Sequence, residues 1–203
     1  MAKLTSGNLA LEIRFKEVDE QNWIQYEIFF LYKDQPMIQD SQLKRTNEHW
    51  QKRSPGAFKA NEHQHDELID VLQKALDTDE PQFYEPTDPD IVLAVYPNKV
   101  FPFLPRNWEL IWASEEAIRK VEDHELVREV AGGRLPDDPF TIILMVDVHN
   151  YGEEHAYHGQ GPALIMIPYR HEVCSFIEAL RAEYREFCQI WGIEEPPKPS
   201  PNV

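Results

Sequence analysis

The sequence predicts an α+β fold, with a mostly antiparallel sheet of about six to seven strands and two main helices, at about residues 65–77 and 171–191, packed on it. Three observations support this class. Hydrophobic and polar residues alternate near the N-terminus, later segments form short apolar runs, and two segments carry hydrophobic residues at helical spacing. We expect a single domain over residues 1–195 and a disordered, proline-rich tail over residues 196–203.

The N-terminal part indicates an antiparallel meander. Residues 9–15 alternate between hydrophobic and polar, the run WIQYEIFFLY at residues 23–32 repeats this pattern, and a polar turn separates the two. A second turn ending at Pro36 precedes a short third strand, which we expect over residues 37–40. Residues 41–61 are polar and show no sustained period, which indicates a long loop.

The middle of the chain is expected to add a helix and a buried strand. After residue 65, hydrophobic residues share one helical face: Leu68, Val71, Leu72, Ala75 and Leu76. The run PDIVLAVYP at residues 89–97 is apolar on both faces, which is typical of a strand in the middle of a sheet. Residues 108–112 are expected to be extended, and residues 115–130 to form a charged peripheral helix.

The C-terminal part indicates a hairpin followed by the clearest helix in the chain. Residues 140–148 and 163–167 are apolar strands, and residues 149–162 connect them. One face of the last helix carries Val173, Phe176, Ile177, Leu180, Tyr184, Phe187 and Trp191.

Composition argues against several classes of partner. The chain has 20 Lys and Arg against 36 Asp and Glu, and its formal net charge of -16 repels phosphate backbones and anionic membranes but attracts basic surfaces. We therefore expect no nucleic-acid partner and no membrane partner, and we expect any protein partner to be basic. Cys174 and Cys188 lie about 21 Å apart on one helix, too far for a disulfide. Because no apolar leader or membrane span is present, we expect a cytoplasmic protein with free thiols.

The connection HNYGEEHAYHGQGP at residues 149–162 concentrates functional side chains. It does not fit a phosphate-binding loop, because Leu164 stands where a third glycine is needed and a strand follows where a helix is needed. Gly159 and Gly161 are then turn residues, and Pro162 sets the backbone at the entrance of the next strand.

Two functional interpretations stay open. In the first, a protein partner is contacted by Trp50, Tyr151, Glu153, Glu154 and Tyr157. In the second, the chain is a metal-dependent enzyme whose divalent ion is held by Asp147, His149, His155 and His158. The spacing of these ligands matches no metal-binding motif, so the first interpretation is favoured, with no cofactor and no catalytic residue predicted.

The pair Gly159-x-Gly161 is followed by an apolar strand and by the helical run FIEALRAEY, in which Phe176 and Leu180 form a Phe-x-x-x-Leu pattern. Ahead of these lie an N-terminal meander, a Leu-rich helix, and Phe83-Tyr84-Glu85 leading into a central strand. In this order of elements the chain resembles small bacterial immunity proteins that block polymorphic toxins, particularly the WapI-like group. The resemblance implies a non-enzymatic protein that covers the surface of a toxin, with its acidic surface steering it onto a basic target.

Overall fold

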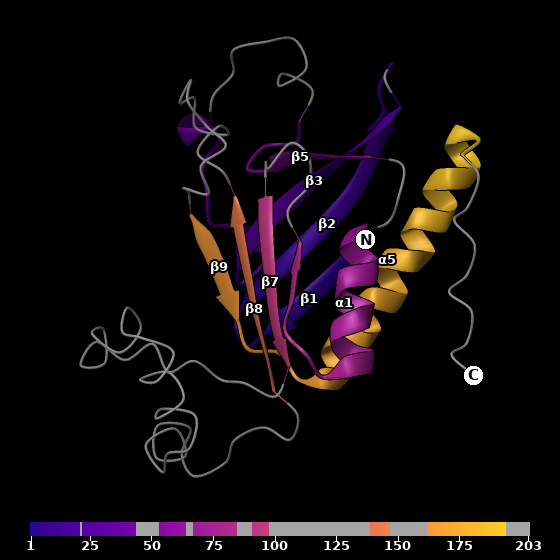
Figure 1. Ribbon diagram of the computed structural model, residues 1–203. Coiled ribbons are helices and arrows are strands. Elements are labelled where there is room, and N and C mark those ends of the chain that lie inside the picture. The colour runs from indigo at the N-terminus through magenta and orange to yellow at the C-terminus, as the bar shows by residue number, and fades with distance from the viewer. Residues whose placement is uncertain are drawn as a thin grey trace, which may run out of the picture.

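The computed structural model describes residues 1–20, 22–43, 53–63, 67–84, 91–97, 139–146 and 162–193. Within these ranges the chain forms two antiparallel sheets, of five and four strands, and two long helices (Figure 1). The predicted α+β class with two main helices is therefore confirmed. The strands are divided between two sheets, where the sequence suggested a single larger one.

Sheet A is the five-stranded sheet, and tight turns build most of it. It contains β1 (Ala2–Ser6), β2 (Leu9–Val18), β3 (Trp23–Tyr32), β4 (Gln35–Pro36) and β5 (Phe58–His63). The order is β1-β2-β3-β4, and β5 also pairs with β3. Gly7, at a φ of 61°, allows the turn between β1 and β2. Lys33 and Asp34, at φ values of 50° and 62°, form the two-residue turn between β3 and β4.

Three parts of sheet A differ from the sequence prediction. β1 (Ala2–Ser6) was not predicted as a strand. The strand expected over residues 37–40 lies instead at Gln35–Pro36, because the two-residue turn starts the return strand at once and Pro36 can stand at a sheet edge. The loop expected over residues 41–61 is wrong at its end, where β5 begins at Phe58. This short alternating segment becomes a strand through its pairing with β3, and not through a strong preference of its own.

Sheet B is the four-stranded sheet, with the order β6-β7-β8-β9. Its strands are β6 (Gln82–Tyr84), β7 (Ile91–Pro97), β8 (Phe140–Val146) and β9 (Ala163–Met166). As predicted, β7 is an internal strand, and β8 and β9 are antiparallel neighbours. The three-residue β6 is too short for its period to be visible in the sequence.

The helices α1 (Glu67–Thr78) and α5 (Arg170–Trp191) lie side by side next to the sheets (Figure 1). Both confirm the predicted helices at residues 65–77 and 171–191. α5 packs on β1 and β2, whereas α1 packs on β6 and β7. Arg170 joins the two helices by donating a hydrogen bond to the carbonyl oxygen of Leu76 at 3.0 Å. The C-terminal cap of α5 is Gly192, in the left-handed conformation at a φ of 66°.

One hydrophobic core joins both sheets and both helices. Alternate residues of each strand point into it, and we call this side of a sheet its inner face and the opposite side its outer face. The buried residues of the core include Leu11, Ile13, Ile24 and Ile28 from sheet A, Leu93, Val95, Ile142 and Leu144 from sheet B, and Leu72, Val173, Phe176 and Leu180 from the helices. Burial of each such side chain stabilises the fold by about 1.5–3 kcal/mol.

Other sequence predictions fall outside the described residues. They are the extended segment at residues 108–112, the helix at 115–130 and the tail at 196–203, and the single domain over residues 1–195 also stays a prediction. In the ranges that are described, no helix is long and apolar enough to cross a membrane.

Candidate binding site

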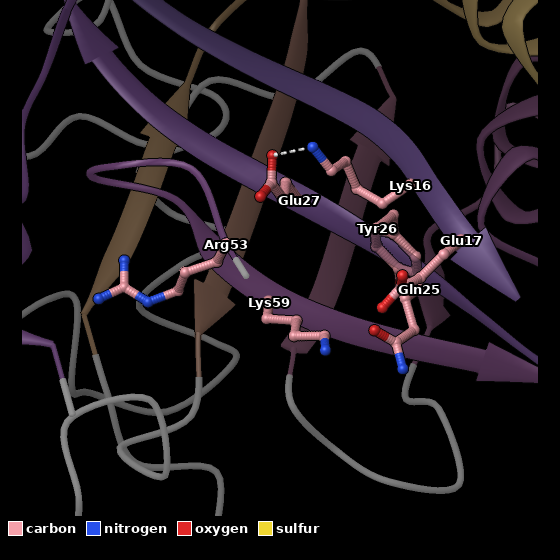
Figure 2. A pocket seen from close by; sticks show the side chains of 7 residues that line it. All are labelled: Lys16, Glu17, Gln25, Tyr26, Glu27, Arg53 and Lys59. Carbon is pink, nitrogen blue, oxygen red and sulfur yellow. Dashed lines mark ion pairs between the residues drawn. The ribbon is translucent and has the colours of Figure 1, made fainter. Parts of the chain in front are cut away.

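A polar pocket lies on the outer face of sheet A (Figure 2). Its lining consists of Lys16, Glu17, Gln25, Tyr26, Glu27, Arg53 and Lys59. These residues come from β2, β3, β5 and the segment just before β5. Glu27 and Lys59 are almost completely buried, with exposed fractions of 2% and 8%. Because burying a charge is costly unless neighbours compensate it, this face differs from an ordinary solvated sheet surface.

A β-bulge in β2 brings two consecutive side chains to the pocket. Phe15 is paired with Tyr26 and the next pair is Glu17 with Gln25, so Lys16 is an extra residue on the bulged strand. Consecutive side chains of a regular strand point to opposite faces, but a bulge changes their direction locally. Lys16 and Glu17 therefore both line the pocket.

Glu27 is the most buried charged residue of the pocket, and three contacts hold its carboxylate. The backbone nitrogen of Ser54 donates a hydrogen bond to Oε1 at 2.5 Å, and the Ser54 hydroxyl donates one to Oε2 at 2.8 Å. Lys16 Nζ lies 3.5 Å from Oε2 (Figure 2). In the strand register, Glu27 stands between Arg14 on β2 and Lys59 on β5. Hydrogen bonds to an ionised acceptor are among the stronger ones in proteins, so this carboxylate is firmly positioned.

Arg53 ties the segment before β5 to the short 3-10 helix η1 (Asp40–Gln42). Its side chain is 3% exposed, and Nη1 lies 2.8 Å from Oδ1 of Asp40. The same nitrogen donates a hydrogen bond to the carbonyl oxygen of Ala57 at 3.1 Å. The guanidinium is therefore a structural anchor at the edge of the pocket.

Gln25 differs from these groups because its buried side-chain oxygen lacks a hydrogen-bond partner in the described ranges. Its exposed fraction is 5%, and no donor in the described ranges forms a hydrogen bond with Oε1. Leaving a buried acceptor without a partner costs about 1–3 kcal/mol. The cavity that Gln25 lines has a volume of about 60 Å³. At about 10–15 Å³ for each water-sized position, it holds roughly four to six such positions.

The residues predicted from the sequence as contact residues or metal ligands are not among the described residues. The expected contact residues, Trp50, Tyr151, Glu153, Glu154 and Tyr157, are outside the described residues, as are the alternative metal ligands, Asp147, His149, His155 and His158. Both sets stay predictions. Among the residues that are described, no three His, Cys, Asp or Glu side chains gather in a way that would hold a metal ion. Cys174 and Cys188 carry free thiols, as predicted.

The pocket itself was not predicted, although the sequence contains one sign of it. Phe15 and Val18 both pack against the core, and they are three positions apart within a single strand. Strict alternation cannot bring two such residues to one face, so an interval of three indicates a bulge. Bulges are frequent beside functional sites, which makes the two residues between them, Lys16 and Glu17, candidates.

Comparison with known proteins gives no assignment: no family model, no curated protein and no solved structure matches the chain. The function therefore has to be inferred from the residues of the chain itself.

Proposed function

We propose that the chain is a cytoplasmic, non-enzymatic binding protein of the immunity type, which acts by covering the surface of a basic protein partner. Its net charge of -16 supports this proposal, because a field of this sign speeds association with basic proteins and weakens when salt screens it. The order of elements that resembles WapI-like immunity proteins supports it as well.

The observation that carries the proposal is the polar network on the outer face of sheet A. Glu27 is held by Ser54 and Lys16, and Arg53 is held by Asp40, so the ionised groups keep their places before any partner arrives. Recognition by groups that are already positioned avoids the entropy loss of ordering them during binding. We therefore place the partner on this face, over the pocket.

The first test is capture of a partner from a lysate by the immobilised full chain, at about 0.05 M and about 0.5 M ionic strength. We expect a basic protein to be retained at low salt and released at high salt. Retention of only acidic or neutral proteins, or retention that does not depend on salt, would contradict the proposal.

A pair of charge variants then locates the contact. Glu17→Lys changes the pocket, whereas Glu178→Lys changes an exposed position on α5. Each substitution replaces one negative charge by one positive charge and changes the net charge from -16 to -14, so long-range attraction falls equally in both. We expect Glu17→Lys to weaken binding of the captured partner about tenfold or more and Glu178→Lys to have a much smaller effect. Equal losses would mean that the partner does not dock on the outer face of sheet A.

A further inference from the structure

We infer that the pocket around Gln25 binds a neutral carboxamide group, presented by an Asn or Gln side chain of the protein partner. The inference rests on the proposed function in one respect, which is that a protein carries the amide. Three features of the pocket support it: its size, its balance of charges and the unpaired oxygen of Gln25.

The size of the cavity restricts what can enter. Drug-sized ligands and cofactors occupy pockets of about 300–1,000 Å³, far more than the 60 Å³ found here. The roughly four to six water-sized positions correspond to a group of about five non-hydrogen atoms. A carboxamide with its adjoining methylene groups has this size, whereas a nucleotide is far too large.

The charges of the lining disfavour an ion of either sign. An incoming anion approaches the carboxylates of Glu17 and Glu27, and an incoming cation approaches Lys16, Arg53 and Lys59. Part of this charge is already paired within the protein, since Glu27 lies beside Lys16 and Arg53 pairs with Asp40. A neutral group with one donor end and one acceptor end avoids like-charge repulsion and still finds partners among both kinds of side chain.

Gln25 supplies the complementary group. Its Oε1 is buried and accepts no hydrogen bond from the part of the chain that the structure describes. An amide that enters the cavity and displaces the side chains covering this oxygen can therefore donate its N–H to an acceptor that loses no existing bond. The nitrogen of the Gln25 carboxamide can in turn donate to the carbonyl oxygen of the same amide. Two amides pair in this way whichever way round the Gln25 carboxamide is placed, because each has a donor and an acceptor.

The test uses three small probes with the same carbon chain and different charge: propionamide, propionate and propylammonium. Each is titrated into the full-length ¹⁵N-labelled protein while the side-chain NH₂ signals of Gln25 are followed by NMR. We expect propionamide to shift these signals with a Kd of about 1–10 mM, which is reasonable for a ligand of five non-hydrogen atoms. Propionate and propylammonium should shift them at least about tenfold less at equal concentration.

Two variants make the result specific. Gln25→Met keeps the length of the side chain and removes the amide, so the NMR signals that disappear in this variant are those of Gln25. We expect the variant to bind propionamide at least about tenfold more weakly, and the backbone amide signals of neighbouring residues report this binding. Gln189→Met makes the same chemical change at an exposed position of α5 and should leave binding unchanged.

The outcomes separate this inference from the proposed function. Equal or larger shifts with propionate or propylammonium, or no shift with any probe, would overturn the carboxamide assignment while leaving capture of a basic partner intact. If propionamide binds but the captured partner binds Gln25→Met as tightly as the unchanged chain, the amide does not come from that partner, which also overturns the inference. If no basic partner is captured at all, the proposed function fails, and with it the claim that a protein carries the amide.

Discussion

Ser54 donates two hydrogen bonds to Glu27, one from its backbone nitrogen to Oε1 and one from its hydroxyl to Oε2. The two residues lie 27 positions apart in the sequence, so this pair fastens the segment before β5 to the middle of β3. It also occupies both oxygens of a carboxylate that is only 2% exposed. The pocket thus depends on a contact between residues that are distant in the chain.

We predict that Ser54→Ala destabilises the protein by about 1.5–3 kcal/mol, because it removes a hydrogen bond to a buried charged acceptor. Urea unfolding measures the change as a lower midpoint with an unchanged slope. Ser175→Ala is the control, since its hydroxyl donates only to the carbonyl oxygen of His171 on the exposed side of α5. Similar effects of the two variants would show that the bond to Glu27 is not special.

Gln25→Met should make the protein more stable, in contrast to most substitutions of buried residues. The change removes a buried oxygen that has no hydrogen-bond partner in the described ranges and keeps a side chain of similar length. We expect a gain of about 1 kcal/mol, seen as a rise in Tm of about 2–4 °C. A fall in Tm would mean that the Gln25 amide contributes to folding, and it would remove one of the grounds for a binding site here. Gln189→Met should leave Tm within about 1 °C.

Gly56 and Gly192 both have positive φ values, 75° and 66°, but they differ in their surroundings. A Cβ added at Gly56 would lie 2.8 Å from Cβ of Pro36, whereas one added at Gly192 meets nothing within 4 Å. Gly192→Ala should therefore cost about 1 kcal/mol, for backbone strain alone. Gly56→Ala should cost about 1–3 kcal/mol more, because the segment before β5 and the β3–β4 hairpin must separate. Chemical denaturation of both variants tests the order, and equal losses would contradict it.

Leu180 lies in the core at 0% exposure, on the face of α5 that packs against sheet A. We predict that Leu180→Ala lowers the free energy of unfolding by about 2–5 kcal/mol through lost burial and the cavity it leaves. Ile190, on the same helix, is 73% exposed, and Ile190→Ala should change stability by less than about 0.5 kcal/mol. If both variants behave alike, the packing of α5 is not as described.

The sequence predicted those elements whose pattern is long enough to be recognised. β3 has the predicted bounds, and α1 and α5 follow the helical spacing of their hydrophobic residues. β1, β5 and β6 escaped prediction because short strands show little periodicity and depend on their neighbours for pairing.

The bulge leaves a sign in the sequence, but the burial of the polar residues in the pocket could not be predicted, for a different reason. Gln25 and Glu27 occupy alternate positions of β3, and such polar positions are ordinarily taken to face water. The carboxylate of Glu27 is instead bonded to Ser54 from the segment before β5, and that contact is long-range. The sequence contains no periodic sign of this contact, whereas the His-rich connection at residues 149–162 stands out in the sequence although most of it lies outside the described residues.

The bulge at Lys16 changes the outer face of sheet A without disturbing the strand pairing that supports the core. On either side of Lys16 the pairs of β2 and β3 run without interruption, from Phe15 opposite Tyr26 to Glu17 opposite Gln25. A chain lacking this one residue would form a regular ladder there and keep every inward-facing neighbour in register with the core. One extra residue thus changes which side chains reach the outer face of sheet A, while the strand pairing that supports the core continues unchanged on both sides of it.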